Sequence, residues 1–226
     1  MLIQPPYPEK FQNRHLSLGK LNTYMNYSEL LVDAEKYITD GFRLKNNPIL
    51  AYHNLEHIRK VIFHVKEISE YYHLNEEDLF TVTAAAWFHD IGYLTGGPMQ
   101  HECRSADIAE AFFKEKFVAD EIINGIRNCI TATTLPQQPT TLLEEIICDA
   151  DLYHFGTEDF FCQDAIMHKE AELRSGKRIE NKAWLMGTIQ LLKSQKYHTK
   201  YCQELLSKNK ELNINKLLSI LEENKC

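Results

Sequence analysis

The hydrophobic residues of this chain recur with the period of an α-helix along almost the whole sequence after Ser28. The clearest stripe, at the spacings i, i+3, i+4 and i+7, follows Asn54 and comprises Ile58, Val61, Ile62, Val65 and Ile68. No segment shows the sustained alternation of polar and apolar residues that a half-buried strand needs. We therefore expect an all-α fold, a single compact bundle of many helices.

Capping and turn residues divide this pattern into separate helices. A first helix over 28–39 is expected to end at Asp40-Gly41, because glycine commonly follows the last turn of a helix. Asn75 is a favourable N-cap for a helix that runs through consecutive alanines to about His89. Besides the helix that begins near Asn54, we expect helices at about 102–117, 119–132, 141–155, 158–175, 181–195, 197–208 and 212–224.

The first 26 residues differ from the rest because they are rich in Pro, Asn and Gln, and we expect them to form an N-terminal arm. No internal repeat or low-complexity linker interrupts the remainder, so residues 27–226 are expected to fold as one helical domain. A chain of this length buries roughly 70% of its unfolded surface, which is enough to fold without disulfides.

Composition excludes several classes of partner. The net charge of −7 argues against a nucleic-acid polymer, whose binding surfaces are usually basic, but a bound cation would still allow small anionic ligands. No apolar run approaches the roughly 18 residues of a membrane span, and the N-terminus lacks the apolar segment of a secretory signal. We expect a cytoplasmic protein with no membrane partner, whose six dispersed cysteines are reduced.

The most informative residues are His89 and Asp90, an imidazole and a carboxylate that close an apolar segment. A buried aspartate is rare unless it is paired or coordinated. His57 lies upstream at the edge of a core-facing stripe, and the acidic pair Asp149 and Asp151 lies downstream after apolar residues. Two imidazoles and two carboxylates form a mixed nitrogen and oxygen site that suits one divalent transition metal, namely Mn, Fe, Co, Ni or Zn.

Asp149 and Asp151 compete for the last position of this set. Their separation of two residues places them about 200° apart around a helix, so only one can face the metal easily. His53 precedes Asn54, the expected N-cap, so the helix fixes only His57 of these two histidines.

The ordered set His57, His89-Asp90 and Asp151 resembles the HD superfamily of metal-dependent phosphohydrolases. The strings YHNLEH, AAWFHDIGY, HECRSA and DADLYHFG are similar to its subgroup of uncharacterised predicted phosphohydrolases. The resemblance is close over about residues 50–157, the expected metal-site core, and loose over the C-terminal helices at 158–226. It implies that His57, His89, Asp90 and Asp151 bind the metal. The implied reaction is hydrolysis of a phosphomonoester, nucleotide or phosphodiester by a metal-activated water.

Other polar residues near these motifs are candidates for catalysis or substrate binding. We assign Asp90, His101 and Glu102 to catalysis, with Asp90 drawing a proton from the water and Glu102 orienting it. The alternative for Glu102 is a favourable acid in the first turn of a helix. His53 and Arg104 are assigned to the substrate phosphate; the alternatives are a structural hydrogen bond for His53 and a solvent-facing side chain for Arg104.

A second metal and two other functions remain as alternatives. Members of the HD superfamily that bind two metal ions have further histidines between the His-Asp pair, here His89-Asp90, and the last aspartate of the set. His101 is one candidate for such a histidine. Another histidine is expected within Ile130–Thr134, but this stretch contains no histidine. The sequence therefore favours a site for one metal ion. The rival functions are a di-iron oxygenase on the same fold and a non-catalytic, metal-stabilised nucleotide-binding or regulatory module. The expected partner is a small phosphorylated substrate, with a nucleotide favoured; the C-terminal helices would suit a homodimer interface or a self-contained core.

Overall fold

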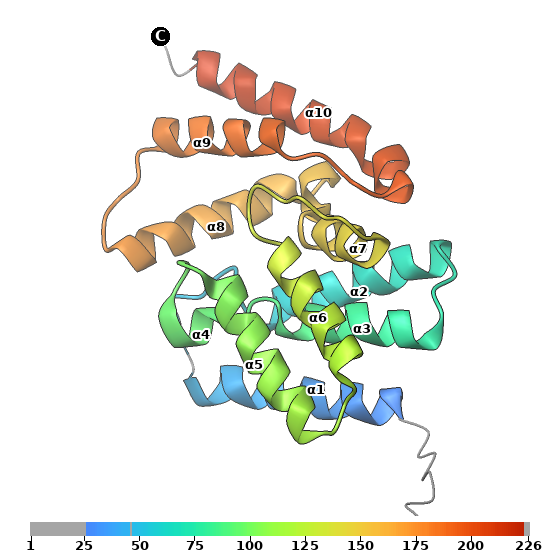
Figure 1. The fold of residues 1–226 in the computed structure, drawn as a ribbon. Coiled ribbons are helices and arrows are strands. Elements are labelled where there is room, and N and C mark those ends of the chain that lie inside the picture. Colours follow the sequence, from blue (N-terminus) through green and yellow to red (C-terminus); the bar gives the residue numbers. More distant parts are fainter. Residues whose placement is uncertain (1–25, 46, 224–226) are drawn as a thin grey trace, which may run out of the picture.

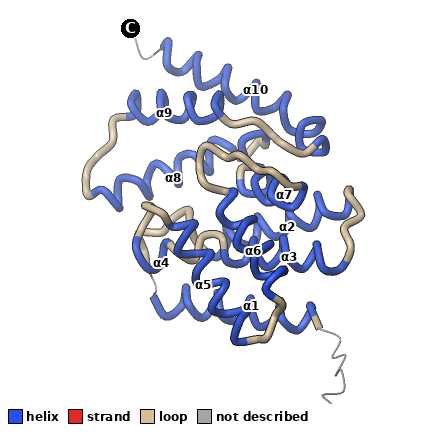
Figure 2. Tube along the Cα trace, viewed as in Figure 1, coloured by secondary structure: helices blue, strands red, loops and turns tan. Residues whose placement is uncertain are grey.

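The structure is a computed structural model, and it describes residues 26–45 and 47–223. All of its regular elements in this part of the chain are helical, which confirms the all-α prediction (Figure 2). The expected N-terminal arm lies outside the described residues except for Asn26. The helices are α1 (Tyr27–Lys45), α2 (Leu55–Tyr71), α3 (Glu76–Phe88), α4 (Tyr93–Gly96), α5 (His101–Glu115), α6 (Asp120–Ala132), α7 (Leu142–Asp151), the 3-10 helix η1 (Tyr153–Gly156), α8 (Phe160–Ser175), α9 (Asn181–Ser194) and α10 (Lys200–Glu223).

Helix α1 does not stop at Asp40-Gly41 as expected but continues to Lys45. A Cβ on Gly41 would lie 3.6 Å from Ile91 Cδ1 and 3.8 Å from Leu94 Cδ1, so the glycine lies on the side of α1 that faces the turn after α3. A glycine inside a helix costs only about 1 kcal/mol relative to alanine. The packing of α1 against α3 and α4 therefore outweighs the local stop signal.

Two further boundaries differ from the expectation. The helix expected over 141–155 is divided into α7 and η1, and the two expected over 197–208 and 212–224 form the single helix α10. The break expected before residue 212 is absent, and Asn213 is buried inside α10. Its Nδ2 donates hydrogen bonds to the carbonyl oxygens of Phe155 (3.0 Å) and Thr157 (3.1 Å). These bonds anchor α10 to η1 and to the residue that follows it.

Helix α3 forms the centre of the bundle. Every residue from Phe80 to Phe88 is buried, as expected for a helix that is apolar on all sides. It packs against α1, α2, α5, α6 and α7, while α8, α9 and α10 are stacked over one end of the bundle and α1 lies at the opposite end (Figure 1). The end of α3 therefore carries His89 and Asp90 into the interior between α2 and α7.

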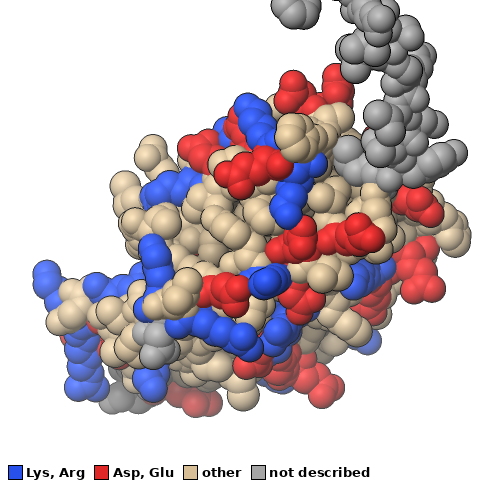
Figure 3. Space-filling model, turned by 90° about the horizontal axis from the view of Figure 1, so that it is seen from below, with Lys and Arg blue, Asp and Glu red and all other residues tan. Residues whose placement is uncertain are grey.

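The surface carries both signs of charge. On the face shown in Figure 3, basic and acidic side chains are interspersed. None of the described helices combines the length and the apolar character needed to cross a membrane. The cysteines at 103, 129, 148, 162 and 202 are unpaired.

Candidate metal centre

His57 is fixed by the first turn of α2. The side-chain oxygen of Asn54 accepts hydrogen bonds from the backbone nitrogens of Glu56 (2.8 Å) and His57 (3.2 Å), so Asn54 is the N-cap. The cap sets the start of the helix and places the His57 ring on its buried side, with 8% of the residue exposed.

His89 and Asp90 follow the last turn of α3. His89 Nδ1 lies 2.8 Å from the carbonyl oxygen of Ala86, which can only accept, so Nδ1 donates a hydrogen there. This bond fixes the orientation of the ring and leaves Nε2 facing the interior. Such a backbone contact is the usual partner of a metal-binding imidazole.

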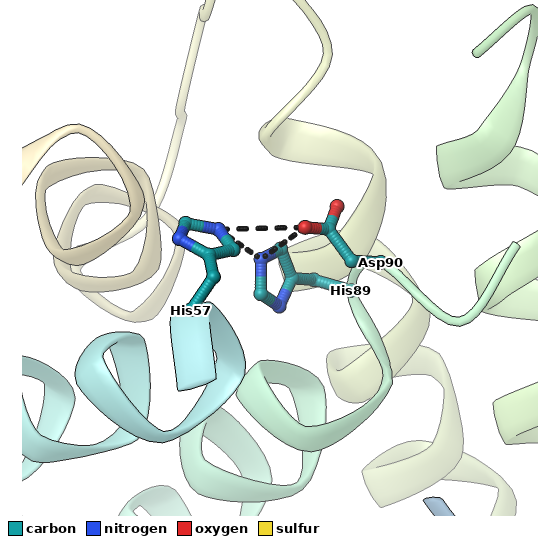
Figure 4. A group of neighbouring side chains, drawn as sticks. All are labelled: His57, His89 and Asp90. Atoms are coloured by element: carbon teal, nitrogen blue, oxygen red, sulfur yellow. Dashed lines mark hydrogen bonds and ion pairs between the residues drawn. The ribbon is translucent and has the colours of Figure 1, made fainter. Parts of the chain in front are cut away.

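Three donor atoms converge at this point (Figure 4). His57 Nε2 and His89 Nε2 lie 3.3 Å apart, and Asp90 Oδ2 lies 3.4 Å from the first and 3.3 Å from the second. His57, His89 and Asp90 are all buried, and together they could hold a metal ion. Away from this centre, the described residues contain no group of three side chains that could hold a metal ion.

Asp90 Oδ2 is buried and accepts no hydrogen bond from any described residue. A buried carboxylate oxygen without a partner is costly, and ionised carboxylates in protein interiors are paired or coordinate metals. The unsatisfied oxygen points between the Nε2 atoms of His57 and His89, which lie 3.4 and 3.3 Å away. The arrangement has the donor types and the direction that a divalent cation requires.

The structure separates the two competing aspartates. Asp151 Oδ1 lies 3.2 Å from His57 Nε2 and 3.7 Å from His89 Nε2. Asp149 points away, and its two oxygens accept hydrogen bonds from the residues that precede α10. Asp151 is therefore the one that faces the candidate metal centre, as the resemblance implied.

The carboxylates make the centre a strongly negative environment. Burial lowers the pKa of His89, but the charges of Asp90 and Asp151 outweigh this effect and raise it to about 9. Burial also raises the pKa of Asp90, while the neighbouring imidazoles hold it well below its usual range. The centre thus favours a positive charge among the four side chains.

His101 lies on the other side of Asp90. Its Nε2 is 3.4 Å from Asp90 Oδ1, and its Nδ1 donates to the Pro98 carbonyl oxygen at 3.0 Å. Glu102 Oε2 lies 3.3 Å from the same Nδ1. At the start of α5, His101 therefore lies beside the expected metal ligand Asp90, and Glu102 lies beside His101.

His53 is close to the centre but is held by a residue that sequence reasoning missed. Its Nδ1 lies 2.6 Å from Glu170 Oε1 on α8, and the backbone nitrogens of Tyr52 and His53 donate to Glu170 Oε2 at 2.7 and 2.9 Å. Arg174 Nη1 donates to Glu170 Oε1 at 2.8 Å. His53 also stacks on Tyr93 at a ring distance of 4.0 Å. Sequence spacing carries no signal for a contact between residues 117 positions apart.

The expected substrate-binding role of Arg104 does not fit the structure. Its guanidinium donates to the carbonyl oxygens of Gly92, Gly97 and Met99. It thus fastens the loop between α4 and α5. Arg174 is the arginine that lies near His53, and its guanidinium carbon is 4.7 Å from the centre of the Tyr93 ring.

Tyr52 and His154 also border the candidate metal centre, and no sequence pattern indicated a role for either residue. Tyr52 packs on His57 at a ring distance of 4.7 Å, and its hydroxyl lies 3.3 Å from His154 Nδ1. Burial lowers the pKa of His154 to about 4, so this imidazole is neutral near pH 7. Tyr52 lies in the string YHNLEH and His154 in DADLYHFG, but neither string alone shows which of its polar side chains face inward.

Residues 54–156 match the family model of the HD domain. This chain carries an HD domain. The match to the HD domain confirms the resemblance that the sequence motifs indicated. All four expected metal ligands lie within the matched residues. HD domains belong to a superfamily of metal-dependent hydrolases. Glu170 and Arg174 lie beyond its matched residues, so this chain supplies them from α8.

Two solved structures share the fold over most of their length. The Lin1889 protein from Listeria innocua is 19% identical, with a TM-score of 0.61; the match covers 89% of this chain and 98% of that one. A protein from Lactobacillus plantarum is 13% identical, with a TM-score of 0.65 and coverage of 87% and 97%. These identities show a common fold alone. No curated protein matches the sequence.

Proposed function

We propose that this HD-domain chain is a metal-dependent phosphohydrolase that acts on a small phosphorylated substrate, with a nucleotide favoured. The observation that carries the proposal is Asp90 Oδ2, a buried carboxylate oxygen without a hydrogen bond that points between the Nε2 atoms of His57 and His89. Packing gives no reason for this arrangement, whereas cation binding does.

His57, His89, Asp90 and Asp151 would hold one divalent transition metal. The imidazoles are oriented with Nε2 inward, and the nitrogen and oxygen donors fit Mn, Fe, Co, Ni or Zn better than a thiolate-bound metal. A second ion is the less favoured alternative, because Thr133 lies where dinuclear relatives were expected to supply a histidine, and its hydroxyl donates to the Ile130 carbonyl oxygen instead.

An ion at this position would polarise a phosphoryl oxygen and lower the pKa of water. Asp90 has a second oxygen, Oδ1, directed toward His101 Nε2, so a proton drawn by Asp90 can be held at that nitrogen. Glu102 lies against His101 Nδ1 and keeps the ring in this orientation. We assign proton transfer to Asp90 and His101, with Glu102 as the positioning residue.

The substrate phosphate is proposed to lie on the side of the centre bordered by His53 and Arg174. Their shared partner Glu170 fixes both side chains, and Arg174 uses only part of its guanidinium for that bond. An arginine presents several N–H groups in a planar fork that suits phosphate oxygens. Arg174 thus replaces Arg104 as the proposed cationic contact.

The remaining expectations about the cellular context stay proposals. We propose a cytoplasmic location because the cysteines of the described chain are unpaired. The net charge of −7 supports a small anionic ligand at a cation site over a nucleic-acid polymer or an anionic membrane surface. Exposed apolar residues of the C-terminal helices, such as Met186 and Leu212, support the proposal of a homodimer.

A phosphatase assay tests the proposal. Wild-type protein, loaded in turn with Mn, Fe, Co, Ni or Zn, is assayed with 4-nitrophenyl phosphate, bis(4-nitrophenyl) phosphate and a panel of nucleoside monophosphates. We expect turnover with at least one metal, a loss of about 100-fold or more in kcat in Asp90→Ala, and full activity in Glu121→Gln on the surface of α6. A metal-loaded wild-type protein that hydrolyses none of these would favour the non-catalytic module.

A further inference from the structure

A cavity of about 280 Å³ lies between α8 and α9. Most of its walls belong to residues 160–192, which follow the part of the chain that matches the HD domain. The walls are largely apolar and include the rings of Phe155, Phe160 and Trp184 and the side chain of Met167. Its volume lies just below the roughly 300–1,000 Å³ of pockets that bind small molecules, and its apolar lining is typical of them.

One carboxylate gives this cavity a polar contact. Asp164 Oδ1 accepts hydrogen bonds from Trp184 Nε1 and Thr188 Oγ1, both at 3.0 Å. Its second oxygen, Oδ2, accepts none from the described residues, although Asp164 lines the cavity. Burial raises the pKa of Asp164, although the hydrogen bonds from Trp184 and Thr188 act in the opposite direction. Oδ2 can therefore accept a hydrogen bond from a donor group of a ligand in the cavity.

Gly187 keeps the wall on the α9 side open. It lies inside the helix and lines the cavity, and a Cβ at this position would meet no atom within 4 Å. A helix is less stable with an internal glycine than with an alanine, and no neighbouring atom is close enough to require a glycine at position 187. Trp184, on the same helix, is held against α8, because its Nε1 donates to Asp164 and its ring stacks on His168 at 4.6 Å with planes 9° apart.

The cavity adjoins the candidate metal centre through His154. This residue lines the cavity and also a smaller one of about 50 Å³, whose walls include His57 and Asp151. A single side chain therefore separates the apolar cavity from the space beside two of the four expected metal ligands.

We propose that the cavity between α8 and α9 binds a planar ring that carries a hydrogen-bond donor, the donor facing Asp164 Oδ2, as the non-phosphate part of the substrate. The assignment of this ring to a phosphorylated substrate rests on the proposed function. Binding of the ring itself does not, since the cavity contains none of the expected metal ligands. Amino-bearing nucleobases have the required size and donor.

Calorimetry with nucleosides tests the proposal without a phosphate or a metal. Adenosine, cytidine and guanosine are titrated into the full chain in the presence of a chelator, beside purine riboside, which lacks the amino group of adenosine. Asp164→Asn keeps an acceptor for Trp184 and Thr188 but can turn a donor toward the cavity. Gly187→Leu fills the cavity from a position where a Cβ has open space. Glu121→Gln on α6 is the matched control.

We expect at least one amino-bearing nucleoside to bind wild type and Glu121→Gln equally. Its affinity should fall about tenfold or more in Asp164→Asn and in Gly187→Leu, and adenosine should bind about tenfold more tightly than purine riboside. The proposal is overturned if none of the three nucleosides binds wild type, or if Asp164→Asn and Gly187→Leu bind as wild type does.

Asp90→Ala separates this proposal from the proposed function. It should bind the nucleoside like wild type while losing hydrolysis. If nucleosides bind but no metal-loaded form hydrolyses a substrate, the proposed phosphohydrolase function is wrong and the ring site stands. If the protein hydrolyses a substrate but binds no nucleoside, the proposed ring site is wrong and the phosphohydrolase function stands.

Discussion

Asp149 and Thr199 are joined by two hydrogen bonds, in which the Thr199 backbone nitrogen and Oγ1 donate to Asp149 Oδ2 at 2.8 and 2.6 Å. Asp149 Oδ1 accepts from the His198 backbone nitrogen at 2.8 Å. Thr199 Oγ1 in turn accepts from the Cys202 nitrogen at 3.2 Å, which caps the first turn of α10. Asp149 therefore anchors α10 to α7, while Asp151 faces the metal centre from the end of the same helix.

Opposite effects are predicted for the two aspartates. Asp149→Ala removes the acceptor of three hydrogen bonds and should lower the free energy of unfolding by about 2–3 kcal/mol, with metal content unchanged. Asp151→Ala should reduce metal content strongly, with a smaller loss of stability in the metal-free protein. Chemical denaturation and elemental analysis of both variants provide the measurements. Loss of metal from Asp149→Ala alone, in folded protein, would reverse the assignment.

Gly92 is predicted to be essential for the position of His101. A Cβ at Gly92 would lie 2.2 Å from the His101 carbonyl oxygen, a backbone atom that can move only with the start of α5. Gly92→Ala should therefore lower the free energy of unfolding by about 1–3 kcal/mol or more and displace His101 from Asp90.

Gly187→Ala is the matched control for this substitution. Its Cβ has open space in a helix, so alanine should raise the free energy of unfolding by about 0.4–1 kcal/mol. Denaturant titrations compare the two variants directly. Equal effects of the two substitutions would show that α5 does not approach Gly92 as closely as described.

Glu170 is predicted to make stability depend on pH. Burial raises its pKa, but the hydrogen bonds from His53 and Tyr52 and the charge of His53 outweigh this and lower the pKa from 4.5 to about 2. Because the pKa is lower in the folded state, the stabilisation is complete above about pH 4.5 and is lost as the pH falls toward 2. The shift corresponds to about 3 kcal/mol.

Glu170→Gln isolates this contribution. The difference in unfolding free energy between wild type and the variant should be about 3 kcal/mol at pH 7 and should shrink between pH 4.5 and 2. Urea denaturation at a series of pH values measures it. A difference that stays constant down to pH 2 would mean that Glu170 is not held as an ion by its neighbours.

The helical periods and the order of the ligand motifs could be predicted from the sequence, because both are local. The stripe after Asn54 gave the buried side of α2, and the Asn54 cap fixed where His57 points. The boundary at Gly41 was wrong, since its effect depends on the turn after α3 that packs against it. The break between residues 208 and 212 was also wrong, and Asn213, just beyond it, is bonded to the carbonyl oxygens of Phe155 and Thr157, which lie 58 and 56 residues away.

Polar contacts between distant segments could not be predicted. His53 was assigned to the substrate phosphate from the sequence, but its partner Glu170, and Arg174 beside it, belong to no motif. Arg104 has the residue type and position of a phosphate contact, and only the structure shows that its donors are used by the carbonyl oxygens of its own loop. The direction of a long cationic side chain depends on tertiary neighbours that spacing does not encode.

Metal content per chain is the most direct test of the central claim. Elemental analysis is carried out on wild type, Asp90→Ala, Asp151→Ala and Asp149→Ala, each purified without chelator and then reconstituted. We predict about one transition-metal ion per chain in wild type and in Asp149→Ala, and little in the other two, as expected for a site of two imidazoles and two carboxylates. The absence of metal from reconstituted wild type, or its full retention in Asp90→Ala and Asp151→Ala, would contradict the account.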